Sequence, residues 1–239
     1  CANLAIALRG EKAAESLYVL PTEANVNGAR DMGVDPERGP GRVALAQPGM
    51  DFGAMLDAAI SGTLKAMIVV GDNPLMFAPD RARVRKALEA LDVLIVIDSL
   101  LTETAKAAHA VLADVPSYGK TGTYTNAERR VNRMHAALAA LGDARPALLA
   151  LTDLANTIGP AGTWAYAHPD AVTDEIAANV PGYERFGAGS SFWGKARVFE
   201  LPSKFETQPV AAATAPLSNG GLLLTTGRTL FTSLEGASI

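Results

Sequence analysis

The stretch that decides the fold is residues 65–133, KAMIVVGDNPLMFAPDRARVRKALEALDVLIVIDSLLTETAKAAHAVLADVPSYGKTGTYTNAERRVNR. Two apolar runs in it, Ala66–Val70 and Val93–Ile97, are rich in Val and Ile and have the length of strands buried on both faces. Between them, Asp80–Leu91 carries apolar residues at helical spacing, with Arg and Lys on the opposite side. This pattern predicts a strand–helix–strand unit with a right-handed crossover and two parallel strands.

Each of these two runs ends abruptly in polar residues. The first is followed by Gly71-Asp72-Asn73-Pro74 and the second by Asp98-Ser99. Because the carboxyl ends of parallel strands meet at one edge of a sheet, we expect these polar tips to lie together. Open α/β sheets bind their ligands at that edge.

Other segments extend this α/β pattern in both directions. Residues 101–109 predict a short helix with Thr102 as its N-cap. The remaining predicted helices are an amphipathic one around Leu4–Leu8, then Phe52–Leu64, Arg145–Ile158 and Val172–Val180. The remaining predicted strands are Ser16–Leu20, Ala110–Leu112, Ala196–Leu201 and Gly221–Thr226, with a linker at Gln208–Ser218.

Two polar stretches allow more than one interpretation. Asn25, Asn27 and Gly28 follow the first predicted strand and are candidate ligand residues or, more simply, turn residues. Residues 119–133 combine Thr, Asn and Arg with little helical periodicity. We predict a loop there, either a solvated one or one that faces a phosphate or nucleotide.

The composition of the 239 residues narrows the function classes. A net charge of −4 and a pI near 5.4 argue against nucleic-acid binding through phosphate contacts. No apolar run has the length of a transmembrane helix. With Cys1 as its one cysteine, the chain cannot form an internal disulfide or ligate an iron–sulfur cluster alone. Because the chain starts on Cys inside a predicted helix, we expect it to be an internal segment of a longer protein. The single cysteine and the lack of a long apolar run favour a cytoplasmic location for that protein.

Four motifs together resemble the molybdopterin oxidoreductase superfamily. They are N-G-A-R-D-M-G at Asn27–Gly33, V-G-D-N-P at Val70–Pro74, D-S-L-L-T-E-T-A at Asp98–Ala105 and G-T-Y-T-N-A-E-R-R-V-N-R at Gly122–Arg133. The resemblance covers residues 15–160 and resumes at Leu222–Leu230. It implies a doubly wound, mostly parallel sheet flanked by helices in residues 1–210. Residues 211–239 would then be a linker and the first strand of a β-rich C-terminal domain of the dinucleotide-binding type.

The resemblance also implies a cofactor and its contacts. In the superfamily, such motifs line the groove of molybdopterin guanine dinucleotide, while iron–sulfur clusters belong to a portion upstream of this segment. It implies no catalytic residue and no metal ligand within this chain. The matching positions, all expected to contact the cofactor or shape its groove, are Gly71, Asn73, Pro74, Asp98, Thr102, Thr104, Gly122, Thr123, Asn126 and Arg129.

Some residues depart from the common pattern of the superfamily. His109 stands where Asp is common, Ala113 where Pro is, Gly119 where Glu is, and Arg130 where Gly is. These departures resemble the branch that became the large iron–sulfur subunit of NADH-quinone oxidoreductase, respiratory complex I. There the segment would be a cofactor-free scaffold contacting other subunits at the cytoplasmic face of the inner membrane.

Two other hypotheses stay open from the sequence. The first is a segment of a molybdenum enzyme such as formate dehydrogenase, which holds the dinucleotide cofactor. The second is an unrelated doubly wound domain, since a parallel sheet alone implies no function.

Overall fold

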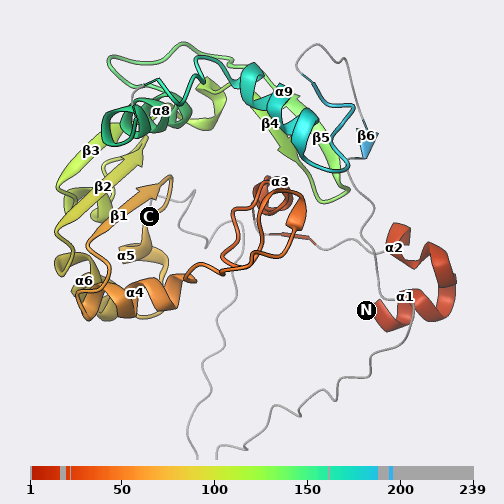
Figure 1. Ribbon diagram of the computed structural model, residues 1–239, viewed down its shortest axis with the longest axis horizontal. Coiled ribbons are helices and arrows are strands. Elements are labelled where there is room, and N and C mark those ends of the chain that lie inside the picture. Colours follow the sequence, from red (N-terminus) through yellow and green to blue (C-terminus); the bar gives the residue numbers. More distant parts are fainter. Residues whose placement is uncertain (1, 17–19, 22, 161, 188–193, 196–239) are drawn as a thin grey trace, which may run out of the picture.

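The computed structural model of the protein describes residues 2–16, 20–21, 23–160, 162–187 and 194–195 (Figure 1). Its α-helices are α1 (Ala2–Arg9), α2 (Ala13–Ser16), α3 (Val26–Asp31), α4 (Phe52–Ile60), α5 (Pro74–Phe77), α6 (Arg81–Glu89), α7 (Glu103–Lys106), α8 (Ala147–Ile158) and α9 (Pro169–Asn179). Its strands are β1 (Ala66–Val70), β2 (Val93–Asp98), β3 (Ala110–Ala113), β4 (Gly122–Thr125), β5 (Arg130–Met134) and β6 (Gly194–Lys195). Short 3-10 helices cover Gly10–Lys12, Pro40–Arg42 and Ser117–Gly119.

The decisive stretch forms a parallel sheet in the order β1-β2-β3. Val69 of β1 aligns with Val96 of β2, which aligns with Val111 of β3. The α/β fold and the parallel pairing predicted from the sequence are therefore confirmed. The sheet occupies the left of Figure 1, with α4 and α6 below it and α8 above it.

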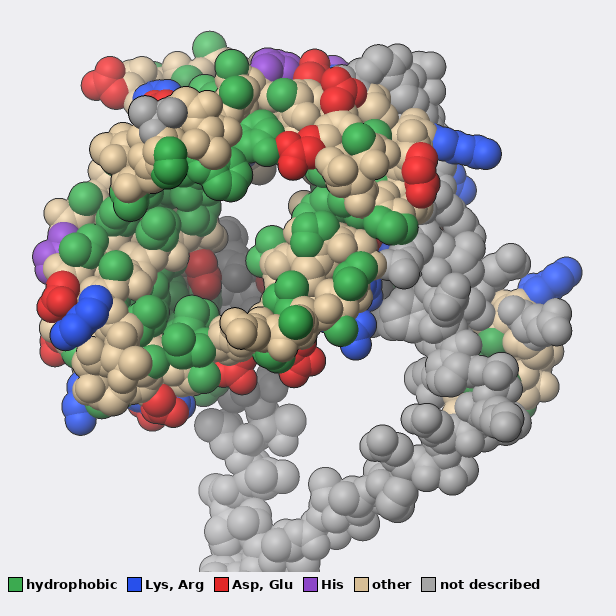
Figure 2. Space-filling view, in the orientation of Figure 1, with side chains coloured by type: hydrophobic (Ala, Val, Ile, Leu, Met, Phe, Trp, Pro, Cys, Tyr) green, Lys and Arg blue, Asp and Glu red, His purple; other side chains and the backbone are tan. Residues whose placement is uncertain are grey.

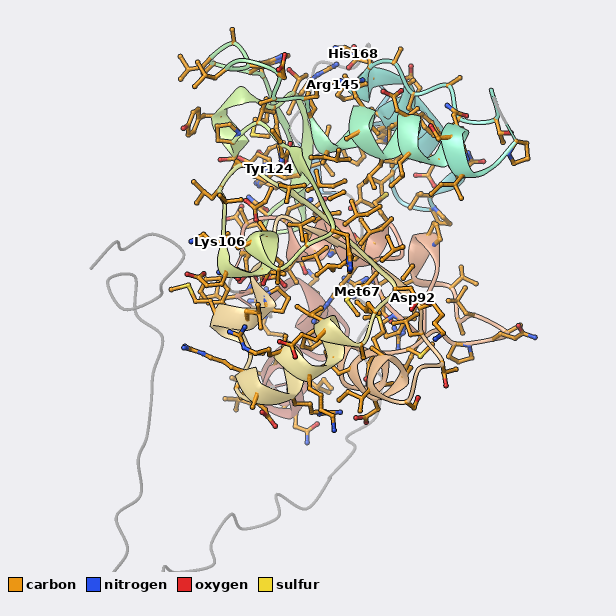
Figure 3. All side chains as sticks on the ribbon, turned by 90° about the vertical axis from the view of Figure 1, so that its left-hand side faces the viewer. Met67, Asp92, Lys106, Tyr124, Arg145 and His168 are labelled. Atoms are coloured by element: carbon orange, nitrogen blue, oxygen red, sulfur yellow. The ribbon has the colours of Figure 1, made fainter. Side chains whose placement is uncertain are left out.

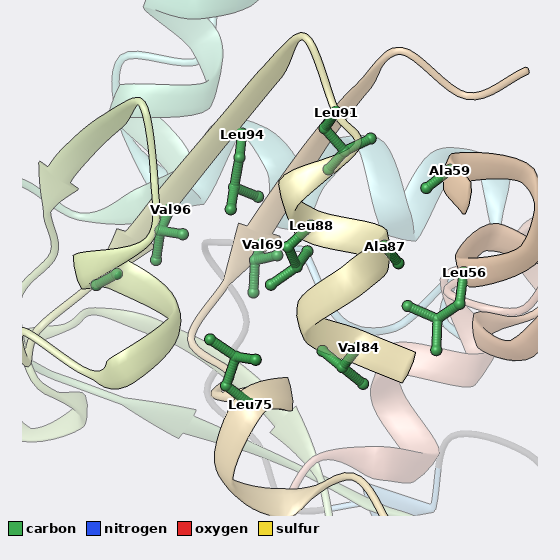
Figure 4. Close-up of a cluster of buried hydrophobic side chains, with 11 residues drawn as sticks. Leu56, Ala59, Val69, Leu75, Val84, Ala87, Leu88, Leu91, Leu94 and Val96 are labelled. Atoms are coloured by element: carbon green, nitrogen blue, oxygen red, sulfur yellow. The ribbon is translucent and has the colours of Figure 1, made fainter. Parts of the chain in front are cut away.

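The main core lies between one face of this sheet and helices α4 to α7. Leu94 and Val96 point from the central strand toward Val84 and Leu88 of α6 (Figure 4). Asp80 caps α6 by accepting a hydrogen bond from the backbone N–H of Arg83 at 2.9 Å. The cap fixes where the helix begins, so its apolar stripe meets the sheet.

Residues 119–133 do not form the predicted loop. They contain the antiparallel hairpin of β4 and β5, which belongs to a second sheet with the order β4-β5-β6. The Asn126 backbone N–H donates to the Arg130 carbonyl and the Arg130 N–H to Asn126 Oδ1, both at 3.0 Å, which closes the turn. The polar composition hid these strands, because Thr125 and Asn132 are polar strand residues that become buried only in the folded chain.

Residues 27–33 correct a second prediction, because most of this stretch is helix α3 and not a turn. Asn25 Oδ1 accepts from the Thr125 N–H at 2.9 Å, and Asn27 Nδ2 donates to the Asn126 carbonyl at 3.1 Å. A Cβ on Gly28 would lie 2.2 Å from Asn25 Oδ1, so this close approach requires glycine. All three candidate residues therefore attach α3 to the hairpin.

The other predicted elements have mixed outcomes. The first helix, β3, α8 and α9 are confirmed with small shifts of their ends. The helices predicted at 52–64 and 101–109 end earlier, at Ile60 and Lys106. Ser16 ends α2 instead of starting a strand. Leu20, the last residue of that predicted strand, is described and belongs to no strand. Residues 17–19, the strands at 196–201 and 221–226, the linker, the boundary near residue 210 and the C-terminal domain lie outside the described residues.

No helix among the described residues has the length and apolar character needed to cross a membrane.

Shortening Ile97 of β2, which alternates with the core residues Leu94 and Val96, tests its burial on the opposite face of the sheet. Ile97 is fully buried, so Ile97→Val should lower the free energy of unfolding by roughly 0.5–1.5 kcal/mol. The measurement is urea denaturation of the chain, followed by circular dichroism. Ile158→Val removes the same methylene from an exposed position of α8 and should change the stability by much less. Equal effects of the two substitutions would contradict the assigned burial of Ile97.

Candidate functional site

The two polar tips of the parallel sheet are held together by Asn73. Its Oδ1 accepts from the Thr104 backbone N–H at 3.2 Å and from Thr104 Oγ1 at 2.7 Å. Its Nδ2 donates to Glu103 Oε2 at 2.9 Å. Asn73 is 5% exposed and Thr104 is fully buried. The predicted meeting of the turn after β1 with the turn after β2 is therefore confirmed, and Asn73 and Thr104 use their polar atoms to make it.

This link changes the ionisation of Glu103. The hydrogen bond from Asn73 Nδ2 stabilises the carboxylate and, with the backbone N–H of Glu103 and nearby Lys106 and Arg81, lowers the pKa of Glu103 below 4.5. Glu103 is thus charged at neutral pH and adds a negative charge to the rim formed by these turns.

The pH dependence of stability tests the hydrogen bond between Asn73 and Glu103. A carboxyl with a depressed pKa stabilises the folded chain above its unfolded pKa, and this contribution is lost as pH falls through the folded pKa. We therefore expect the stability difference between the protein and Glu103→Gln to be largest above about pH 4.5 and to vanish at lower pH. A pH-independent difference would contradict the assignment. In Asn73→Ala, NMR titration should show the pKa of Glu103 moving back up.

Four other predicted residues lie at the same edge. Pro74 is buried at the first position of α5, and Thr102 caps α7 by accepting from the Ala105 N–H at 3.1 Å. Asp98 is half-buried, and its Oδ1 accepts from the Leu100 N–H at 2.9 Å. Gly71 has a positive φ of 62°, and a Cβ there would meet nothing within 4 Å. Gly71 and Asp98 are therefore the predicted residues of this edge that remain open to a ligand.

Gly122 and Thr123 lie in a separate cavity of about 250 Å³. This partly open cavity is lined by residues of β4, the start of α8, α9 and the region of α3, and Lys120 and Tyr183 also lie in its wall. Lys120 Nζ pairs at 2.5 Å with Asp114, a buried carboxylate whose Oδ1 also accepts from the Ala147 N–H at the start of α8. No atom lies within 4 Å of a Cβ built on Gly122, so a ligand can approach the backbone there.

Asn126 and Arg129 belong to the hairpin turn and to a buried charge cluster. Arg129 Nη2 pairs with Asp31 Oδ2, and Arg42 Nε pairs with Asp31 Oδ1 at 2.5 Å. Tyr183 Oη lies 2.8 Å from Asp31 Oδ2 and 2.8 Å from Thr125 Oγ1. Because a carboxylate only accepts, Tyr183 donates to Asp31 and Thr125 donates to Tyr183. Burial, the largest cause, and the Asp31 carboxylate raise the pKa of Tyr183, so the phenol stays protonated.

Arg129 also has a strained backbone conformation and side-chain nitrogens without hydrogen-bond partners. Its φ is 64°, a conformation that favours glycine, so the glycine-like position of this turn is Arg129 and not the neighbouring Arg130. Its Nε and Nη1 are buried with no hydrogen-bond partner among the described residues. Two unpaired cationic N–H groups suit an anionic acceptor.

The predicted residues therefore form two groups. Gly71, Asn73, Pro74, Asp98, Thr102 and Thr104 border the parallel sheet, whereas Gly122, Thr123, Asn126 and Arg129 belong to the second sheet. In Figure 3, Tyr124 of the hairpin and Lys106 of α7 lie toward one side, and Met67 and Asp92, near the amino ends of β1 and β2, lie toward the other. The hairpin is thus displaced toward the carboxyl edge of the parallel sheet.

One of the sequence departures has a structural role. His109 Nδ1 accepts from the Leu94 N–H at 2.9 Å, and the His109 N–H donates to the Leu94 carbonyl at 2.9 Å. Both bonds lie at the amino end of β3, opposite the edge that carries Asn73. The His109 departure therefore does not alter the polar turns.

Sequence reasoning missed Asp31, Tyr183 and Glu103, which pair with residues distant along the chain. Asp31 and Tyr183 are separated by 152 positions along the chain, and Glu103 and Asn73 by 30. The acidic residue inside the N-G-A-R-D-M-G motif was one available signal, but nothing local indicates that two arginines surround it.

Among the described residues, no group of three His, Cys, Asp or Glu side chains could hold a metal ion.

Comparisons with known proteins identify the family of the chain. The family model described as molybdopterin oxidoreductase matches residues 3–157, which include both groups of polar residues. The chain therefore belongs to the molybdopterin oxidoreductase family. A solved structure, acetylene hydratase from Pelobacter acetylenicus, is similar with a TM-score of 0.49 and 17% identity, over 78% of this chain and 28% of that one.

Two curated relatives are more similar in sequence. "Putative formate dehydrogenase YrhE" of Bacillus subtilis (strain 168) is 34% identical over 79% of this chain and 22% of its own length. NADPH-Fe(3+) oxidoreductase subunit alpha of Geobacter sulfurreducens (strain DL-1 / KN400) is 33% identical over 95% of this chain and 29% of its own length. The chain thus spans less than a third of the length of these relatives.

Proposed function

We propose that the chain is the segment of a molybdopterin-dependent oxidoreductase that holds the dinucleotide end of the cofactor. The observation that carries the proposal is the Asn73 link, which fixes two polar turns side by side at the carboxyl edge of the parallel sheet. In this proposal Gly71, Asp98, Gly122 and Thr123 face the cofactor. Asn73, Pro74, Thr102, Thr104 and Asn126 hold the turns in shape.

The residues present suit such a cofactor. Gly71 and Gly122 leave open backbone that a pyrophosphate can approach, and Arg129 has two unpaired buried N–H groups that suit an anion. The Asp98 carboxylate can accept hydrogen bonds from the amino and imino groups of guanine or from ribose hydroxyls. The cofactor when bound would supply the redox chemistry, and this segment would supply binding and orientation.

The names of the relatives suggest the reaction of the longer protein. One relative is named as a formate dehydrogenase and another as an NADPH-Fe(3+) oxidoreductase subunit. We infer a two-electron oxidation of a small substrate such as formate, with electrons passed to other subunits of a redox complex. We prefer this hypothesis to a cofactor-free scaffold in the large iron–sulfur subunit of respiratory complex I, because this chain has the linked polar turns and the open glycines that a cofactor would need.

Metal and nucleotide analysis of the full-length protein tests the proposal. Molybdenum or tungsten and acid-released guanine nucleotide should be near stoichiometric with the polypeptide. Asp98→Ala should lower the guanine content, while Asp92→Ala, an exposed aspartate just before the amino end of the same strand, should leave it unchanged. Absence of both metal and guanine nucleotide from the purified protein would favour the scaffold hypothesis instead.

A further inference from the structure

The second face of the parallel sheet is apolar and only partly covered. We call this the outer face; it consists of Ile68 and Val70 of β1 and Val93, Ile95 and Ile97 of β2. Ile97 is buried, but Ile68, Val70 and Val93 are 44%, 43% and 42% exposed. Parallel sheets are found almost only with both faces covered, so exposed β-branched side chains here indicate a missing layer.

Helix α8 borders this face without being buried itself. None of its twelve residues, all of them described, is fully buried, although five are Leu or Ile. Between α8 and Ile68 runs an open groove of about 360 Å³, lined also by Leu148, Leu151, Leu154, Ile158 and Trp164. The lining contains no charged side chain. Figure 2 shows hydrophobic side chains gathered beside a hollow in the surface over β1 and β2.

The chain order explains why this layer is incomplete. From β1 to β2 to β3 the chain steps in one direction across the sheet, and α6 and α7 pack on the same face. Crossovers are right-handed, so helices that cover the other face come from strands stepping the opposite way, beyond the edge of β1. Among the described residues, β1 has no partner strand at that edge.

We propose that the outer face and its groove dock a strand–helix unit from another part of the same polypeptide. Its strand would pair with β1 at the edge where the described residues provide no partner strand, and the apolar side of its helix would fill the groove. The relatives are long enough to contain such a unit elsewhere in their sequence, because the match to this chain covers 22% and 29% of their lengths. A second copy of the chain fits less well, since a twofold contact would place two concave grooves face to face.

Hydroxyl-radical footprinting with mass spectrometry tests the proposal on the full-length protein and on the 239-residue chain. Oxidation of Trp164 and Ile158 should be at least about tenfold lower in the full-length protein, because docking closes the groove. Leu141, which is 90% exposed and not in the lining of the groove, should be oxidised equally in both.

Each other outcome identifies a different occupant or none. Equal oxidation of Trp164 in both forms overturns the proposal. Protection in the 239-residue chain that grows with concentration assigns the groove to a second copy, and protection that needs an added subunit assigns it to a separate partner. As a second readout, Ile68→Asp should lower the melting temperature of the full-length protein, whereas Val43→Asp, an exposed apolar residue outside the groove lining, should change it little.

Discussion

Asp31→Ala is expected to destabilise the folded chain by about 3–5 kcal/mol, the largest effect of any single substitution proposed here. Asp31 is 1% exposed and accepts from Arg42, Arg129 and Tyr183. Removing its carboxylate leaves two arginines partly buried without their anion. The same change removes one of the contacts that join α3 to the hairpin turn. The measurement is the urea unfolding midpoint of the chain, followed by circular dichroism.

Asp92→Ala is the matched control for this experiment. Asp92 also pairs with a cation, but Lys65 Nζ lies 3.7 Å away and both side chains are more than 60% exposed. Exposed pairs contribute little, so we expect a change within about 0.5 kcal/mol. The cost of Asp31→Ala should also fall when Arg129 has first been replaced, because one buried cation is then absent. Equal costs in both backgrounds would show that the pair is not coupled.

Asn73→Ala is expected to cost about 2–4 kcal/mol, because it leaves the buried Thr104 N–H and hydroxyl without their acceptor. It should also separate the turn after β1 from α7, and thereby loosen the proposed cofactor rim. Hydrogen exchange should therefore speed up at residues 71–77 and 102–106 while the far edge of the sheet is unchanged. Uniform acceleration across the sheet would indicate global destabilisation alone.

Asn156→Ala provides the matched comparison. The Asn156 side chain makes two hydrogen bonds, one fewer than that of Asn73. Both join it to the backbone of Trp164 and are exposed to solvent. Water replaces the lost partners there, so the expected cost is roughly 1 kcal/mol or less. A cost for Asn156→Ala equal to that for Asn73→Ala would contradict the structural importance of the buried link.

The local pattern of the sequence was sufficient for the parallel sheet. The apolar runs at Ala66–Val70 and Val93–Ile97 and the helical spacing at Asp80–Leu91 each act within a few residues, so their outcome does not depend on distant partners. The polar turns after the strands then follow from parallel pairing, which brings Asn73 to Thr104. Three of the four motifs that resemble the molybdopterin oxidoreductases lie in the same stretch, and the family comparison confirms the resemblance.

Only the tertiary structure decided the second sheet and the roles of its residues. The strands Gly122–Thr125 and Arg130–Met134 have a polar pattern, and they are stable because α3 and Tyr183 supply partners from distant parts of the chain. Asp31 joins Arg129 across 98 positions, which no local spacing encodes. Periodicity records which face of an element is apolar, but it does not record which charged or polar groups meet when the elements pack. That distinction is why the sequence predicted the parallel sheet and missed the buried cluster around Asp31, which contacts the hairpin of the second sheet.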